Sequence, residues 1–393
     1  MSDNNGSYDF LPVEIANNIL LRLPTKSIIT CICVCKTWKS IIQNPTFIST
    51  HLHLSINNNN KHHLLFRFGS WTRESYALHK DDDDDCTQHT RFAFPLLVPE
   101  LGPLNGLSSL VGTCNGLICF FNELSSYEID TFFLWNPCVR RFVILPSPNV
   151  TLRTHGELVR FIGFGFGFDA KTKDYKVVRL VTHWDNPKFP KDRPVVEVYS
   201  LATGEWRLVS AWPPICTLID GFEHTSFYFE PQRFVNGALH WLAYHYTDCF
   251  ILAFDLGDEV FRKILLPEDP IPSHYPYASV SGYGDSIVFC HSMSYSLDIW
   301  VMKEYGVASS WTKVFSIPDP LRPGEYIPRP RGFSRNGEVV LIVGDKWKLA
   351  SMDLENQKMK DLGIDSRADL MVHAAMRLMV DELEAMLDVV EDF

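Results

Sequence analysis

Strand and turn signals repeat along most of this chain, and the repetition leaves few folds open. From about residue 60 to about residue 364, apolar and polar residues alternate with the period of two that half-buried strands show. Each unit has a hairpin turned by Asn-Gly or a similar polar turn, then a second hairpin turned by a loop such as "ATGE" or "GDEV". Units of four strands that recur roughly every 40 to 55 residues have the spacing of propeller blades.

Five such units are visible directly in the sequence. They begin at "SLVGTCNGLICFF", "FIGFGFGFD", "QRFVNGALHWLAY", "ASVSGYGDSIVFCHS" and "GFSRNGEVVLIVG". The segments "HHLLFRF", "SYALHK" and "TRFAFPL" form a more divergent first unit, so the count reaches about six. We therefore predict an all-β, propeller-like domain of about six four-stranded blades, with a repeated β-sandwich as the alternative.

The glycines of "FIGFGFGFD" invite comparison with a phosphate-binding loop. Such a loop opens directly into a helix, whose free N–H groups face the phosphates. Here a polar turn and a Tyr/Val-rich stretch follow, and no Gly-Lys-Ser/Thr lies nearby. The interpretation we favour is a strand with Phe164, Phe166 and Phe168 on one face, whose glycines let a neighbouring element approach the other face.

The segment over residues 11–52 has a helical period instead. Ile15 and Ile19 fall on one helical face, Pro24 interrupts the pattern, and the last apolar segment stops before Pro45. Three short helices bury too little surface to be stable alone, so this unit is expected to complete its core against a partner.

The chain is thus predicted to be an α+β multidomain protein. We expect a disordered N-terminus over residues 1–10, a three-helix unit over 11–54, the propeller-like domain over 55–368, and an acidic amphipathic tail over 369–393. Apolar residues at helical spacing in the tail favour a helix there.

The net charge of −11 is concentrated in two places. Asp81 to Asp85 and the last thirteen residues, which contain six acidic and no basic side chains, account for all of it. A body without basic excess argues against nucleic-acid binding. No apolar run is long enough to span a membrane and no signal-peptide pattern opens the chain, so we expect a cytoplasmic or nuclear protein.

Catalytic and metal-binding patterns are not convincing in this sequence. The ten cysteines include no Cys-x-x-Cys pair, and the closely spaced Asp220, Glu223 and His224 have no nucleophile beside them. We therefore expect no catalytic residues, no metal and no cofactor.

The helical segment resembles the F-box closely. Its Leu-Pro at 11–12, Arg-Leu-Pro at 22–24, Cys-Val-Cys-Lys at 33–36, Trp38 and Pro-x-Phe at 45–47 fall at that family's spacings. The segments "CNGLICF", "LWNPCVRRFVILP", "GFGFDAKTKDYKVV" and "FDLGDEVFRKILLPE" look like the F-box-associated domain of plant proteins of the F-box/kelch and S-locus F-box groups.

This resemblance implies the non-catalytic substrate-receptor subunit of an SCF cullin-RING ubiquitin ligase. The F-box would bind a Skp-type adaptor and, through it, the cullin and the RING subunit, while the β domain would bind an unknown protein substrate. The alternatives are an adaptor-bound scaffold and a small-ligand-binding propeller receptor.

Two sets of candidate residues follow from the resemblance. The adaptor-binding set is Leu11, Pro12, Ile15, Leu20, Leu23, Pro24, Val34 and Trp38. The substrate-binding set lies on three long loops with aromatic or arginine side chains and comprises Trp184, Phe189, Trp212, Phe222, Tyr326 and Arg329.

Overall fold

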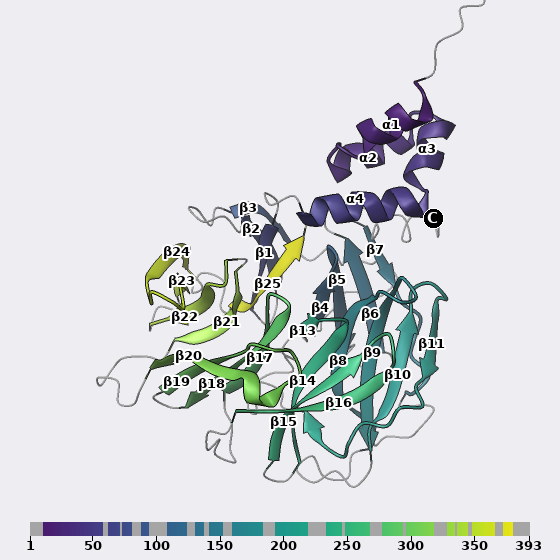
Figure 1. Cartoon of the computed structure of the whole chain (residues 1–393). Coiled ribbons are helices and arrows are strands. Elements are labelled where there is room, and N and C mark those ends of the chain that lie inside the picture. Colours follow the sequence, from purple (N-terminus) through teal and green to yellow (C-terminus); the bar gives the residue numbers. More distant parts are fainter. Residues whose placement is uncertain are drawn as a thin grey trace, which may run out of the picture.

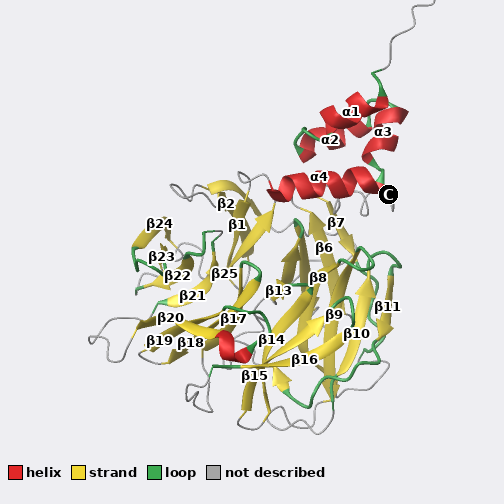
Figure 2. Ribbon diagram, in the orientation of Figure 1, coloured by secondary structure: helices red, strands yellow, loops and turns green. Residues whose placement is uncertain are grey.

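The structure is a computed structural model of the 393-residue chain, with helices gathered in one part and strands in the other (Figures 1 and 2). The residues that it describes are 11–57, 62–70, 73–80, 88–93, 108–123, 130–136, 141–151, 159–183, 193–218, 233–245, 248–267, 277–293, 296–317, 328–334, 336–344, 348–365 and 372–379. The predicted disorder of residues 1–10 lies outside them.

The N-terminal unit contains four helices rather than the three predicted. They are α1 (Val13–Leu20), α2 (Thr25–Ile32), α3 (Lys36–Ile42) and α4 (Pro45–Asn57). Pro45 does end the third helix, but it also begins the fourth, because a proline at the first helical position loses no hydrogen bond. The side chain of Asn44 caps α4 by accepting from Thr46 N at 2.8 Å. The predicted boundary after residue 54 therefore falls inside α4.

The helices build a small core of their own. Leu20, Ile28 and Ile42 are completely buried, and Phe47 joins them from α4. His51 Nε2 lies 3.0 Å from Leu23 O and ties α4 to the turn between the first two helices. Within the described ranges, every extensive contact of a helix is with another helix, so the unit is only loosely attached to the strands.

The strands form six antiparallel sheets, which we number as blades one to six in chain order. Blade one comprises β1 (His62–Ser70), β2 (Arg73–Lys80), β3 (Gln88–Ala93) and β25 (Val372–Met379). Blade two comprises β4 (Ser108–Cys114), β5 (Leu117–Glu123), β6 (Asp130–Asn136) and β7 (Arg141–Ile144). Blade three comprises β8 (Val159–Asp169), β9 (Asp174–His183), β10 (Val195–Ser200) and β11 (Glu205–Leu208).

The remaining strands form the other three blades. Blade four comprises β12 (Thr217–Leu218), β13 (Arg233–Val235), β14 (Ala238–His245), β15 (Asp248–Asp255) and β16 (Val260–Leu265). Blade five comprises β17 (Tyr277–Tyr283), β18 (Ser286–Met293), β19 (Ser296–Met302) and β20 (Trp311–Ile317), with the short 3₁₀ helix η2 (Ala308–Ser310). Blade six comprises β21 (Arg329–Phe333), β22 (Val339–Val343), β23 (Lys348–Met352) and β24 (Met359–Asp365).

The prediction of about six four-stranded blades needs one correction. Five of the sheets have four strands, whereas blade four has five. Its innermost position is divided between β13, which pairs Arg233 with His240, and β12, which pairs Leu218 with Ala243. Two short strands therefore cover successive parts of one edge of β14.

The inner strands close into a ring. β4 contacts β8, β8 contacts β13 and β14, these contact β17, β17 contacts β21, and β21 contacts β25, which returns to β4. This circular arrangement is a β-propeller, and the β-sandwich alternative is wrong.

The ring is closed by β25, where an amphipathic helix was predicted. Residues 372–379 pair with β1, with Leu65 opposite Met376 and His62 opposite Met379. The helix prediction is wrong for this stretch because blade one lacks an inner strand without it, and the open edge of β1 would leave backbone N–H and C=O groups unpaired. The rest of the predicted tail, residues 369–371 and 380–393, lies outside the described residues.

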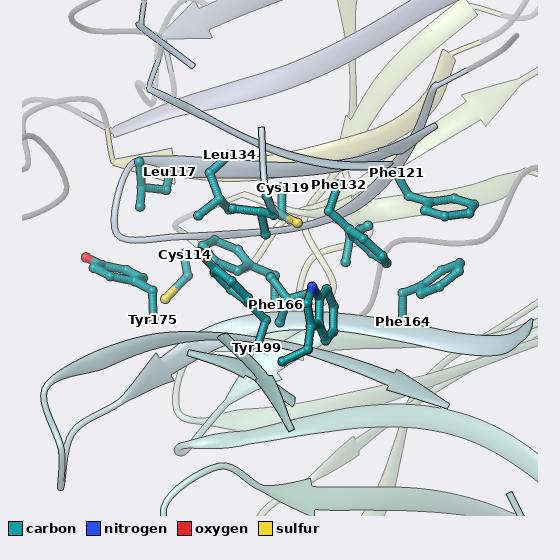
Figure 3. Packing of buried hydrophobic residues seen from close by; sticks show 14 residues of the cluster. Cys114, Leu117, Cys119, Phe121, Phe132, Leu134, Phe164, Phe166, Tyr175 and Tyr199 are labelled. Atoms are coloured by element: carbon teal, nitrogen blue, oxygen red, sulfur yellow. The ribbon is translucent and has the colours of Figure 1, made fainter. Parts of the chain in front are cut away.

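The glycine-rich segment is the inner strand β8, as predicted. Phe164 packs against Phe121 with ring centroids 4.4 Å apart, and Figure 3 shows Phe164 and Phe166 among the buried aromatics of blades two and three. On the other face, a Cβ at Gly165 would lie 2.5 Å from Leu239 Cδ1 in blade four. The glycines allow this approach, and Trp241 Nε1 donates to Phe164 O at 2.9 Å across the gap.

Candidate interaction surfaces

The helical unit exposes apolar side chains that its own core does not use. Leu11, Ile15 and Val34 are 52%, 47% and 61% exposed, and Val13 and Ile19 are similarly open. The sequence prediction included the first three and missed Val13 and Ile19. Ile19 could have been found, since it lies one helical turn after Ile15 on the same face of α1.

Several residues of the predicted adaptor-binding set have another position. Leu20 is completely buried among the helices, so its placement in direct contact with a partner is corrected: it is a core residue. Leu23 and Trp38 are half-buried against the same core. Pro12 and Pro24 are exposed and precede the first residues of α1 and α2.

Basic side chains accompany the apolar surface. Residues 11–57 contain four Lys or Arg and a single acidic residue, Glu14. Arg22, Lys36 and Lys39 are exposed. Exposed apolar side chains on a unit with an excess of basic groups fit a protein partner that offers apolar and acidic groups.

The propeller has two distinct sides. Blades two to six each start with an inner strand and end with an outer strand, whereas blade one takes its inner strand, β25, from the end of the chain. In every blade the last residue of the outer strand lies on the side where the inner strands begin, which we call the loop side. The helices join the propeller at the start of β1, where His62 pairs with Met379 at the end of the inner strand β25. They therefore attach at the opposite, helix side.

The loop side carries the two substrate-binding candidates that the structure describes. Trp212 lies in the connection from β11 to β12 and is 65% exposed. Arg329 is the first residue of β21 and is half-buried opposite Ile342. Leu208, at the end of β11, is also exposed, and no sequence signal marks it because it has the same strand parity as the buried Trp206.

Four further substrate-binding candidates lie outside the described residues: Trp184, Phe189, Phe222 and Tyr326. Trp184 and Phe189 follow β9, whose last residue, His183, pairs with Val159 at the loop-side start of β8.

Buried charges in the propeller have structural partners. Arg179 and Glu197 are a completely buried pair, and Glu197 Oε1 also accepts from Asn149 N at 2.9 Å and Val150 N at 3.1 Å. Together they hold the connection from blade two to blade three against β9 and β10.

A second charged group joins blades three and four. Lys176 Nζ donates to Asp169 Oδ2 at 2.8 Å and to Glu259 Oε1 at 3.0 Å, and Arg207 donates to both carboxylate oxygens of Glu259. Burial raises the pKa of Asp169, but hydrogen bonds from Lys176 and Thr172 outweigh it and hold that pKa below its usual value. These ionised side chains stabilise the contact between the two blades.

Nucleophilic and metal-binding chemistry finds little support in the described part of the chain. Burial raises the pKa of the Cys216 thiol to about 12 and that of Cys119 well above its usual value, so both thiols are neutral. No group of three His, Cys, Asp or Glu side chains suited to a metal ion occurs in the ranges given above. Among those ranges there is also no helix of the length and apolarity required to cross a bilayer.

A four-helix unit with an exposed apolar surface, joined to a closed β-propeller, defines a two-part interaction protein. Comparison with known protein families finds a match for each of the two parts. Residues 9–50 match the F-box domain, and residues 103–372 match the F-box associated beta propeller domain. The chain therefore belongs to the plant F-box proteins that carry an F-box-associated domain, which confirms the resemblance read from its motifs.

Its relatives in Arabidopsis thaliana are also named as F-box proteins. F-box protein CPR1 is 28% identical over 369 residues, covering 90% of this chain and 84% of that protein. An F-box/kelch-repeat protein is 29% identical over 321 residues, covering 80% and 82%. Among solved structures, TolB from Acinetobacter baumannii matches with a TM-score of 0.44 and 10% identity over 82% of this chain and 69% of that chain.

Proposed function

We propose that this protein is the substrate-receptor subunit of an SCF ubiquitin ligase. The observation that carries the proposal is the exposed apolar surface of a helical unit that is loosely attached to a propeller. A Skp-type adaptor would cover Leu11, Ile15 and Val34, with Val13 and Ile19 added, and would link the chain to the cullin and the RING subunit. Trp38, which packs against the helical core, would support these exposed side chains.

The second half of the proposal is a separate substrate surface. The loop side of the propeller would bind a protein substrate through Trp212 and Arg329, together with Trp184, Phe189, Phe222 and Tyr326. Exposed aromatic and arginine side chains on connections between rigid strands have the composition of interface hot spots. Because the helices join at the helix side, both partners could bind at once.

The chain itself would contribute no catalytic group to ubiquitin transfer. Its role would be to hold the substrate near a conjugating enzyme recruited through the cullin, which raises the effective concentration of the reacting groups.

A deletion experiment tests this division of labour. Full-length chain and a fragment of residues 58–393, which starts after α4, are each expressed with an affinity tag in plant tissue under proteasome inhibition. Full-length chain should retain adaptor, cullin and substrate, whereas the fragment should retain the substrate and lose the adaptor. A folded full-length chain that captures no adaptor would contradict the ligase function, and a folded fragment that captures none of the substrate would contradict the propeller as receptor.

A further inference from the structure

The two acidic segments of the chain leave the propeller at one place, although they are about 300 residues apart in sequence. Asp81 to Asp85 follow Lys80, which pairs with His63 in β1. Residues 380–393 follow Met379, which pairs with the adjacent His62. Neighbouring strands lie about 5 Å apart, so both segments start within about 10 Å of the first residue of β1.

This end of blade one is also where the helical unit joins. Four residues, 58 to 61, separate the end of α4 from β1. The net negative charge of the whole protein is therefore attached beside a helical unit in which four Lys or Arg face one Glu. Unlike charges attract each other over distances comparable to the Debye length, about 10 Å, so the attraction would act once an acidic segment has come near the helices.

Residues 380–393 also carry apolar groups that could cover the exposed apolar side chains of the helices. Between the six acidic side chains lie Leu383, Met386, Leu387, Val390 and Phe393. The helical unit offers the complement, with Leu11, Ile15 and Val34 exposed and Lys36 and Lys39 near them in sequence.

The length of this segment is sufficient to reach the whole of α4. Fourteen extended residues span up to about 46 Å. The linker of residues 58–61 spans at most about 18 Å and the thirteen residues of α4 about 20 Å, so the far end of α4 lies within about 38 Å of the start of β1. The other helices pack on α4 or on each other.

We propose that residues 380–393 dock on the exposed apolar surface of the helices of the same chain and compete there with the adaptor. The proposal rests on the proposed function, since it names the adaptor-binding surface as the site that the segment occupies. Release of the segment, by substrate or by a basic competitor, would then expose the surface for assembly.

The first test measures adaptor affinity by isothermal titration with full-length chain and with a chain that ends at Met379 and keeps β25. The truncated chain should bind the adaptor at least about fivefold more tightly than the full-length chain. This difference in affinity should shrink in about 0.5 M salt, because salt screens the attraction between acidic and basic groups. Neutralising the segment in the full chain, with D381N, E382Q, E384Q, D388N, E391Q and D392N, should have the same effect. The control E205Q/D285N, on blades three and five, should have none.

A second readout does not involve the adaptor. A carbodiimide couples a lysine amine to a carboxylate only when the two are in contact, so treated full-length chain should yield peptides that join Lys36 or Lys39 to residues 380–393. Equal adaptor affinity for the full and truncated chains, with no such cross-link, would overturn the docking. Cross-links without adaptor binding by either chain would support the docking and contradict the ligase function instead.

Discussion

Arg179 and Glu197 form an ion pair that solvent does not reach, with Arg179 Nη1 2.6 Å from Glu197 Oε2 and both side chains completely buried. The pair lies across neighbouring strands, since Arg179 is opposite Glu197 in the pairing of β9 with β10. Arg179 Nη1 also donates to Val150 O at 2.6 Å. The buried ion pair and the connection between blades two and three therefore stabilise each other.

Glu197→Gln should destabilise the propeller by about 3 to 5 kcal/mol, because it leaves the Arg179 guanidinium buried without its counter-charge. The exposed pair of Lys313 and Asp298, at 3.2 Å, provides a control, and Lys313→Ala should cost less than about 1 kcal/mol. Urea unfolding monitored by tryptophan fluorescence measures both. Similar losses for the two variants would show that the buried pair has no special role.

The double variant Leu11→Ala/Val34→Ala should weaken adaptor binding by about 2 kcal/mol or more, since both side chains are exposed on the proposed adaptor surface. Leu265→Ala, an equally exposed leucine on β16, is the matched control and should bind normally. Isothermal titration gives the affinities. Leu20→Ala should instead unfold the helical unit, because it empties a completely buried position.

Gly165→Val should destabilise the protein by about 1 to 3 kcal/mol or prevent folding, because the added side chain meets Leu239 of blade four. Gly112→Ala is the mild comparison, since a Cβ there lies 3.4 Å from Phe166 Cβ, an ordinary contact. Thermal unfolding measures both. We also expect wild-type protein to bind neither ATP nor NAD at these glycines, and saturable binding in equilibrium dialysis would refute the strand-only interpretation of this motif.

His240 should make the folded state less stable in acid. Burial lowers its pKa from 6.5 to about 4, although Arg233 O accepts a hydrogen bond from its ring and opposes the shift. Between pH 6.5 and pH 4 the unfolded chain binds a proton that the folded chain does not, so stability is full above pH 6.5 and falls as the pH drops, by about 3 kcal/mol at most.

Urea unfolding at a series of pH values checks this dependence. His240→Gln should remove most of it in that window, whatever its effect on stability at pH 7. A variant with an unchanged slope would assign the pH dependence to other groups.

The propeller could be predicted from the sequence because its hairpin turns and strands are each specified by residues close together in the chain. Asn115-Gly116 and Asn236-Gly237 take the positive φ angles that tight hairpins require, and the strands around them alternate visibly. The same holds for β8, whose three glycines predict a close approach even before the neighbouring blade is known.

Errors arose where distant parts of the chain decide the structure. The apolar residues around Met376 have helical spacing. This stretch is a strand because it pairs with the open edge of β1, which lies roughly 300 residues earlier in the chain. Leu20 carries the same F-box signature as Leu11, and only the packing of Ile28 and Ile42 shows that Leu20 faces inward. The F-box motif therefore identifies the helical unit, but it does not show which residues of that unit are exposed on its surface.

The closure of blade one by β25 also sets an order of events during synthesis. The helices leave the ribosome early, whereas the propeller lacks an inner strand until residues 372–379 have been made. At about 5 to 20 residues per second, the roughly 300 intervening residues take on the order of 15 to 60 seconds to translate. A nascent chain could therefore present its proposed adaptor surface well before the propeller that carries the proposed substrate surface is closed.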